Sequence, residues 1–78
     1  MTDPDTIETI LDAIASRKNE QLKLAHDAHQ KMCEMHQKGD HHEAGRLSIA
    51  REHHNYTAHQ LSMLLTQCQS IADEVMQS

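Results

Sequence analysis

The residues of this chain best suited to chemistry are its histidines and cysteines. All eight histidines lie between residues 26 and 59, and four potential metal ligands follow one another at steps of three, four and three: His26, His29, Cys33 and His36. On a helix these steps align side chains along one ridge, where neutral imidazole and thiolate can ligate zinc or copper. Four ligands on one ridge span three turns, so a single tetrahedral ion would need ligands from another helix or chain. We expect no metal or other cofactor, and a His/Cys-rich metal-binding protein is kept as the alternative.

A pH response is a second use of the same histidines. Imidazole is the side chain that gains charge on mild acidification. Eight added protons would turn the formal net charge of −5 into +3, with the change confined to the middle of the sequence. A pH-responsive protein therefore belongs to the same alternative.

Catalytic motifs are incomplete in this sequence. His42-Glu43 resembles the start of a zinc-protease helix, but Arg46 stands where the second metal-binding histidine is required. Cys33 has His29 and His36 one turn away, as in a thiol–imidazole pair, yet an exposed helix supplies neither oxyanion donors nor a substrate cavity. With only two glycines, no Gly-rich phosphate loop is present. We expect no catalytic residue and no enzymatic activity.

These side chains must be positioned by helices, because the apolar residues recur at helical spacing. Thr2 or Asp3 can cap a helix that has Pro4 in its first turn, and the pattern predicts a first helix over about 4–37. Lys18 and Gln21 interrupt its apolar face, so the helix either bends or lays these long side chains along the apolar surface. The apolar residues of this helix are Ile7, Ile10, Leu11, Ile14, Leu22, Ala25, Ala28, Met32 and Met35.

A break at residues 38–40 separates this helix from a second one, predicted over about 41–76. Gly39 can adopt the left-handed conformation that ends a helix, and Asp40 with Glu43 is typical of a capping box. Gly45 is interpreted as a tolerated helix glycine. A heptad seam is predicted along Leu47, Ala50, His54, Thr57, Leu61, Leu64, Cys68, Ile71 and Val75, widened by Leu65, Ala72 and Met76.

The short connection makes the two helices antiparallel, so the expected fold is an all-α hairpin forming a single domain over residues 1–78. Facing residues have numbers that sum to about 79, which pairs Leu11 with Cys68 and Ala25 with His54. Cys33 and Cys68 then lie roughly 30 Å apart, beyond the reach of a disulfide. Free thiols, an acidic N-terminus and no apolar run of about 20 residues favour a cytoplasmic protein without membrane contact.

The composition favours a protein that binds other proteins. The chain has 78 residues, no Phe or Trp and one Tyr, so a lone hairpin buries little area. A second hairpin, in a homodimer, or a partner protein would complete a four-helix bundle. Few basic residues and no aromatic platform exclude nucleic acid. The predicted partner-binding residues are Ile10, Leu11, Ile14, Leu24, Leu47, Ile49, Leu61, Leu64, Leu65, Ile71 and Val75.

The hairpin, its turn at Gly39-Asp40, the acidic start over 2–8 and the stripe over 61–75 together resemble the small co-chaperones of type III secretion needle proteins. These are short acidic helical hairpins that pair with a helical-repeat chaperone and keep the needle subunit unpolymerised. The resemblance covers the layout of most of the chain, whereas the many histidines and the missing aromatic residues depart from it. It implies a chaperone-like adaptor that docks through Leu47, Leu61, Leu64 and Ile71.

Overall fold

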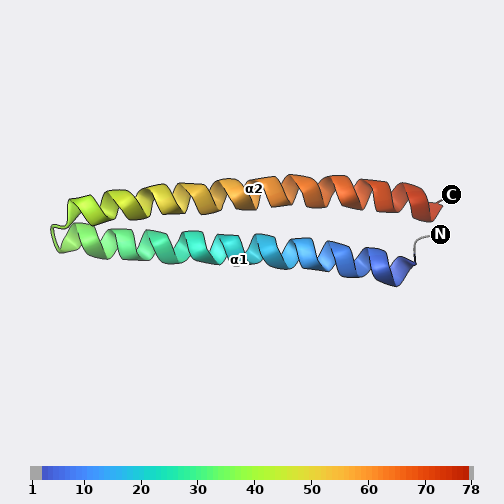
Figure 1. Ribbon diagram of the computed structural model, residues 1–78, viewed down its shortest axis with the longest axis horizontal. Coiled ribbons are helices and arrows are strands. Elements are labelled where there is room, and N and C mark those ends of the chain that lie inside the picture. The colour runs from blue at the N-terminus through green and yellow to red at the C-terminus, as the bar shows by residue number, and fades with distance from the viewer. Residues whose placement is uncertain (1–2, 78) are drawn as a thin grey trace.

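The structure is a computed structural model that describes residues 3–77 as two long helices joined by a tight turn (Figure 1). Helix α1 spans Pro4–Gln37 and helix α2 spans His41–Gln77. No strand occurs in this part of the chain. The expected all-α antiparallel hairpin is confirmed, and the second helix ends one residue later than expected.

The start of α1 is fixed by a side-chain cap. Asp3 has an extended backbone, and its Oδ1 accepts a hydrogen bond from the Asp5 backbone N–H at 3.1 Å. Pro4 follows at the first helical position, where its missing N–H costs no intrahelical bond. Asp3 is therefore the cap of α1, and Thr2, the other residue considered, lies outside the described residues.

The turn between the helices closes both helix ends with backbone hydrogen bonds. Gly39 has a φ of 83°, which confirms the predicted left-handed conformation. The Gly39 N–H donates to the His36 carbonyl at 3.1 Å and the Asp40 N–H donates to the Met35 carbonyl at 2.8 Å, the two bonds of a Schellman motif. Asp40 Oδ1 then accepts from the Glu43 N–H at 3.1 Å, which caps the start of α2.

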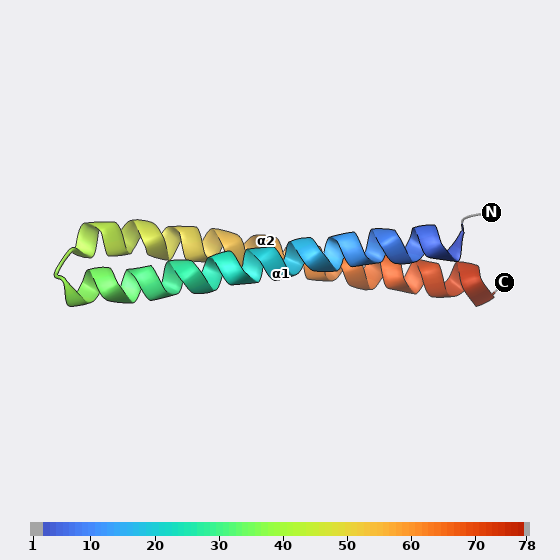
Figure 2. The same ribbon diagram turned by 90° about the horizontal axis from the view of Figure 1, so that it is seen from below.

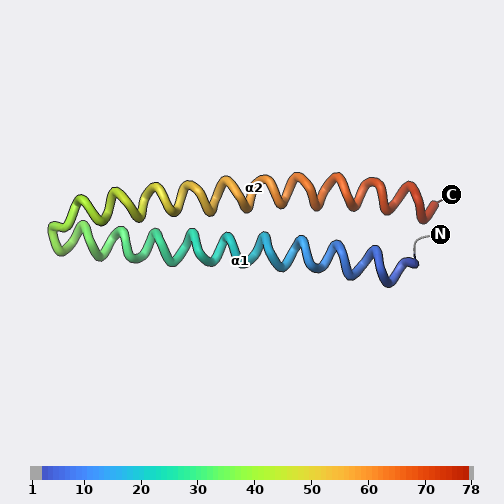
Figure 3. Tube along the Cα trace, viewed as in Figure 1, coloured from blue at the N-terminus to red at the C-terminus, as the bar shows by residue number. Residues whose placement is uncertain are grey.

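The molecule is a rod, as the trace in Figure 3 shows. Its extents are 59 × 16 × 12 Å and its radius of gyration is 17.6 Å, whereas a compact domain of this length has a radius of gyration of about 11.5 Å. Turned by 90°, the rod shows α1 passing across α2 near the middle (Figure 2). The two helices therefore wind around each other as a coiled pair, and each has one neighbour.

The buried side chains between the helices are all small. Within the described residues, every buried hydrophobic side chain is an alanine, and no large side chain is fully buried. Alanines allow two helix backbones to approach closely, but each hides little apolar area. The buried residues are Ala25, Ala28, Ala44, Ala58 and Ala72.

The seam of α2 differs in phase from the predicted one. Leu64 and Ile71 are 44% and 60% exposed, so their predicted place in the interhelical seam is wrong. Val75, although 51% exposed, follows Ala72 by the next step of three and lines the groove between the helices. The predicted seam residues that are half-buried or buried are Leu47, Ala50, His54, Thr57, Leu61, Leu65, Cys68 and Ala72. The seam residues that the structure turns toward α1 at alternating steps of three and four are Ala44, Leu47, Arg51, His54, Ala58, Leu61, Leu65, Cys68 and Ala72.

A similar correction applies to α1, where Ile10 and Leu22 are 52% and 47% exposed and so lie outside the seam. Lys18 and Gln21 are half-buried, and the helix continues through them without interruption. Gln21 Oε1 lies 2.7 Å from His54 Nδ1 on α2. Of the two alternatives for this polar segment, the structure shows a continuous helix whose long side chains lie against α2.

Candidate protein-binding surface

The predicted histidine ridge is held partly by hydrogen bonds. Arg51 Nη1 lies 2.9 Å from His29 Nδ1, and His29 Nε2 lies 3.7 Å from Cys33 Sγ. Because a guanidinium can only donate, His29 Nδ1 accepts from Arg51, and the remaining ring N–H at Nε2 faces the Cys33 sulfur. The His29 ring is therefore oriented by a residue of the other helix.

A second histidine contact bridges the turn. His36 and His41 bring their Nδ1 atoms to 3.0 Å of each other, with ring centroids 5.2 Å apart. Both side chains are exposed. One ring must donate and the other accept, so a single hydrogen bond joins the end of α1 to the start of α2.

Each of these contacts joins two side chains. Within residues 3–77, no group of three or more His, Cys, Asp or Glu side chains is placed to hold a metal ion. Cys33 and Cys68 are both free, Cys33 exposed and Cys68 half-buried. On the ridge of α1, these contacts involve His29, Cys33 and His36.

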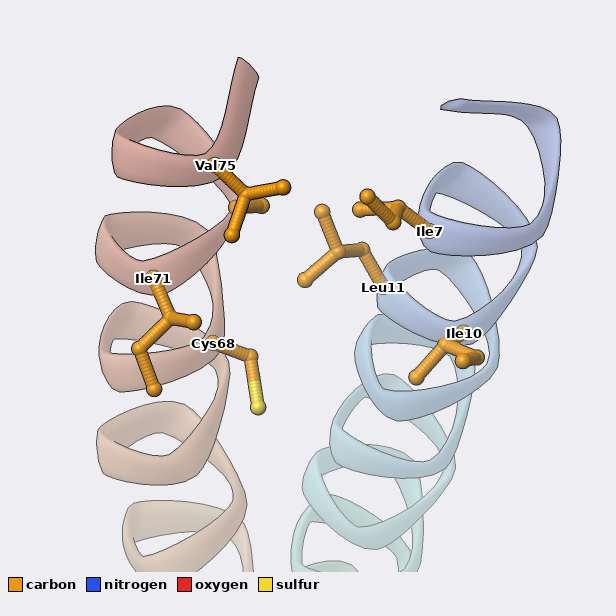
Figure 4. Close-up of a pocket in the computed structure, with 7 residues that line it drawn as sticks. Ile7, Ile10, Leu11, Cys68, Ile71 and Val75 are labelled. Carbon is orange, nitrogen blue, oxygen red and sulfur yellow. The ribbon is translucent and has the colours of Figure 1, made fainter. Parts of the chain in front are cut away.

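An apolar groove opens between the helices at the end of the rod that carries both termini (Figure 4). Ile7 and Leu11 of α1 point toward Val75 of α2, and Cys68 lies deeper in the groove. Its volume is about 190 Å³. The lining residues, all of them apolar or sulfur-bearing, are Ile7, Ile10, Leu11, Cys68, Ile71, Ala72 and Val75.

A longer apolar surface runs along the outside of α2. Five large side chains, 44% to 69% exposed, fall within an arc of about 100° when placed at the helical period. This arc points away from the buried Ala58 and Ala72. We call it the outer stripe, and its residues are Ile49, Tyr56, Met63, Leu64 and Ile71.

Helix α1 adds two residues beside the outer stripe. Ile10 and Leu24 are 52% and 40% exposed, and their separation of two heptads places them on one face of α1. Ile10 and Ile71 line the same groove, so this face of α1 continues the outer stripe across the interhelical boundary. The groove and the outer stripe form one connected apolar surface.

The structure divides the predicted partner-binding residues into two groups. Six are exposed to solvent: Ile10, Leu24, Ile49, Leu64, Ile71 and Val75. Five are half-buried along the line where the helices meet: Leu11, Ile14, Leu47, Leu61 and Leu65.

Tyr56 and Met63 belong to the exposed surface but are absent from the predicted set. Both are at least 48% exposed. Their spacing of seven residues after Ile49 carried the signal, because a seven-residue repeat keeps side chains on one helix face. The prediction included Ile49 from this face but did not extend the repeat to Tyr56 and Met63.

Charge is divided between the two halves of the rod. Residues 21–59, the half nearest the turn, carry five acidic and five basic residues and all eight histidines. The open half, residues 1–20 and 60–78, carries the whole formal charge of −5. Its charged residues are Asp3, Asp5, Glu8, Asp12, Glu20, Asp73 and Glu74 against Arg17 and Lys18.

Comparison with known proteins gives no relative. No protein-family model matches the chain, and neither a curated protein nor a solved structure matches it. Over residues 3–77, no helix is both long and apolar enough to span a membrane.

Proposed function

We propose that this hairpin is a non-enzymatic interaction module that binds protein through the groove and the outer stripe. The observation that supports this most is the surface left uncovered. The chain exposes 5946 Å², whereas a compact monomer of 8.9 kDa exposes roughly 4,800 Å². The difference is of the same order as the roughly 800 Å² that each partner covers in a standard interface.

The interior gives an independent reason to expect a partner. Helices of this kind depend on tertiary packing of an apolar face more than on intrinsic propensity, and here the buried residues are alanines. The large side chains Ile49, Ile71 and Leu64 face solvent instead. Covering them removes more apolar area from water than the helix–helix contact does through its alanines.

The resemblance to needle co-chaperones supplies one class of partner, a helical-repeat chaperone. Of the four residues it implies, Leu64 and Ile71 are exposed, while Leu47 and Leu61 are half-buried between the helices. A partner of this class would therefore contact the chain through Leu64 and Ile71, and the other two would support the hairpin itself.

The experiment compares two double variants of a tagged chain in affinity capture from its native cells. Leu64→Asp/Ile71→Asp places charges on the apolar surface. It should lower the mass of captured protein at least tenfold, because a buried unpaired charge is strongly unfavourable. Leu22→Asp/Met76→Asp is the matched control, since Leu22 and Met76 are 47% and 62% exposed but lie on the opposite flank.

Circular dichroism of both variants checks that the helices remain. Equal capture by the two double variants would contradict the assigned surface. A wild-type chain that is folded, monomeric at high concentration and captures no protein would contradict the function itself.

A further inference from the structure

We propose that the occupant of the outer stripe is the outer stripe of a second copy of this chain, with the two α2 helices antiparallel about a twofold axis at Gln60. This inference rests on the proposed function and names its partner. It is carried by the pattern of the exposed residues, by the division of charge along the rod and by the uncovered area.

The outer stripe is nearly palindromic. Ile49 and Ile71 lie eleven residues before and after Gln60, and Tyr56 and Leu64 lie four before and after it. A twofold interface uses the same patch on both copies, so that residue i meets residue j and j meets i. Antiparallel pairing at Gln60 sets Ile49 against Ile71 of the second copy and Tyr56 against its Leu64.

The charges favour the antiparallel orientation. An aligned pair would bring the two open halves, each with a formal charge of −5, side by side. The antiparallel pair instead sets the open half of each copy beside the histidine-containing half of the other. The half nearest the turn has equal numbers of acidic and basic residues, so the antiparallel pair avoids the like-charge repulsion that suppresses the aligned arrangement.

One ion pair in particular follows from the register. Arg46 and Glu74 lie fourteen residues before and after Gln60, so Glu74 of one copy reaches the neighbourhood of Arg46 in the other. The Arg46 side chain is 72% exposed and holds Glu43 at 3.5 Å, a long distance for a charge-assisted hydrogen bond. Glu74 would also approach the N-terminal end of α2, where a negative charge is favourable.

The test uses a chain without its native thiols, Cys33→Ser/Cys68→Ala, carrying one new cysteine at an exposed position. Gln60→Cys should cross-link to its own copy under mild oxidation, because the twofold axis passes beside it. Ile49→Cys alone and Ile71→Cys alone should not, since each residue lies on the order of 33 Å from its equivalent, while a disulfide needs Cα atoms within about 7 Å. An equal mixture of these two variants should cross-link, and light scattering should give the mass of a dimer.

The outcomes separate the failure of this inference from the failure of the proposed function. Self-cross-linking of Ile49→Cys and of Ile71→Cys, as in an aligned pair, overturns the antiparallel arrangement. A monomeric chain that still captures another protein through Leu64 and Ile71 overturns self-pairing only. A monomer that captures nothing overturns both.

Discussion

The imidazoles of His36 and His41 face each other through Nδ1 atoms 3.0 Å apart, with room for one hydrogen between them. One ring donates this hydrogen and the other accepts it. The contact joins the last turn of α1 to the first turn of α2 and should therefore stabilise the hairpin.

A double-mutant cycle measures this contact. His36→Ala, His41→Ala and the double variant should give a favourable coupling free energy. Chemical denaturation followed by circular dichroism supplies the unfolding free energies. The same cycle on His26 and His53, exposed histidines on the two helices, is the control, and an equal coupling free energy there would contradict the assignment.

Sequence spacing predicted which histidines share a ridge, because the helical period decides that. It could not predict that His36 meets His41, since their separation of five residues crosses a turn whose geometry depends on Gly39. Nor could it predict that Arg51 meets His29, which depends on the rotation of α2 about its own axis. Contacts between two helices can be predicted only when the packing of the helices is known as well as the helical period.

Among the elements, the turn has the strictest conformational requirement. Gly39 has a φ of 83°, where an L side chain costs about 1–2 kcal/mol. Gly45 is an ordinary helical residue, and a Cβ placed there meets no atom within 4 Å. Substitution by alanine should therefore have opposite effects on the free energy of unfolding at the two glycines of the chain.

Gly39→Ala should lower the free energy of unfolding by about 1–2 kcal/mol, and Gly45→Ala should raise it by about 1 kcal/mol. Denaturant unfolding at one fixed protein concentration measures both, so that any association affects the variants equally. Destabilisation by Gly45→Ala would show that a partner approaches the backbone there.

The limits of both helices could be predicted because they depend on local chemistry: Asp3 and Pro4 at one start, Gly39 and Asp40 at the turn. The rotation of α2 about its own axis could not be predicted. Leu64 and Ile71 are apolar, and so are Leu65 and Ala72 one residue later, so two adjacent phases are both consistent with a heptad seam. The structure selects the phase with Ala58 and Ala72 inside, which lets the helices approach closely and leaves the larger residues outside.

For the whole molecule, the division of charge along the rod has a measurable effect on the proposed dimer. Salt screens the attraction between Arg46 of one copy and Glu74 of the other, so the effect of changing either residue should shrink as ionic strength rises. Arg46→Glu alone and Glu74→Arg alone should each weaken the dimer, and the double swap should recover most of the affinity. Sedimentation at two salt concentrations measures the dissociation constants of the wild-type chain and the three variants. If the double swap weakens the dimer by the sum of the two single effects, the pairing is contradicted.

The hairpin fold could be predicted from the sequence, whereas the exposed apolar surface that we propose for association could be predicted only in part. An apolar residue in a heptad repeat predicts burial but not which neighbour covers it. Ile49 and Ile71 show this, because each fits a helix face and neither is covered by α1. The one aromatic residue, Tyr56, was missed although it lies seven residues after Ile49 on the same helix face.

Helix α1 begins and helix α2 ends at the same pole of the rod, opposite the turn (Figure 1). In an antiparallel pair, the end of α2 in one copy and the start of α1 in the other are therefore separated by most of the 59 Å length. A tandem gene fusion with a ten-residue Gly/Ser linker, which reaches about 18 Å on average, cannot pair its two halves with each other. Such a fusion would have to join neighbouring molecules into open chains.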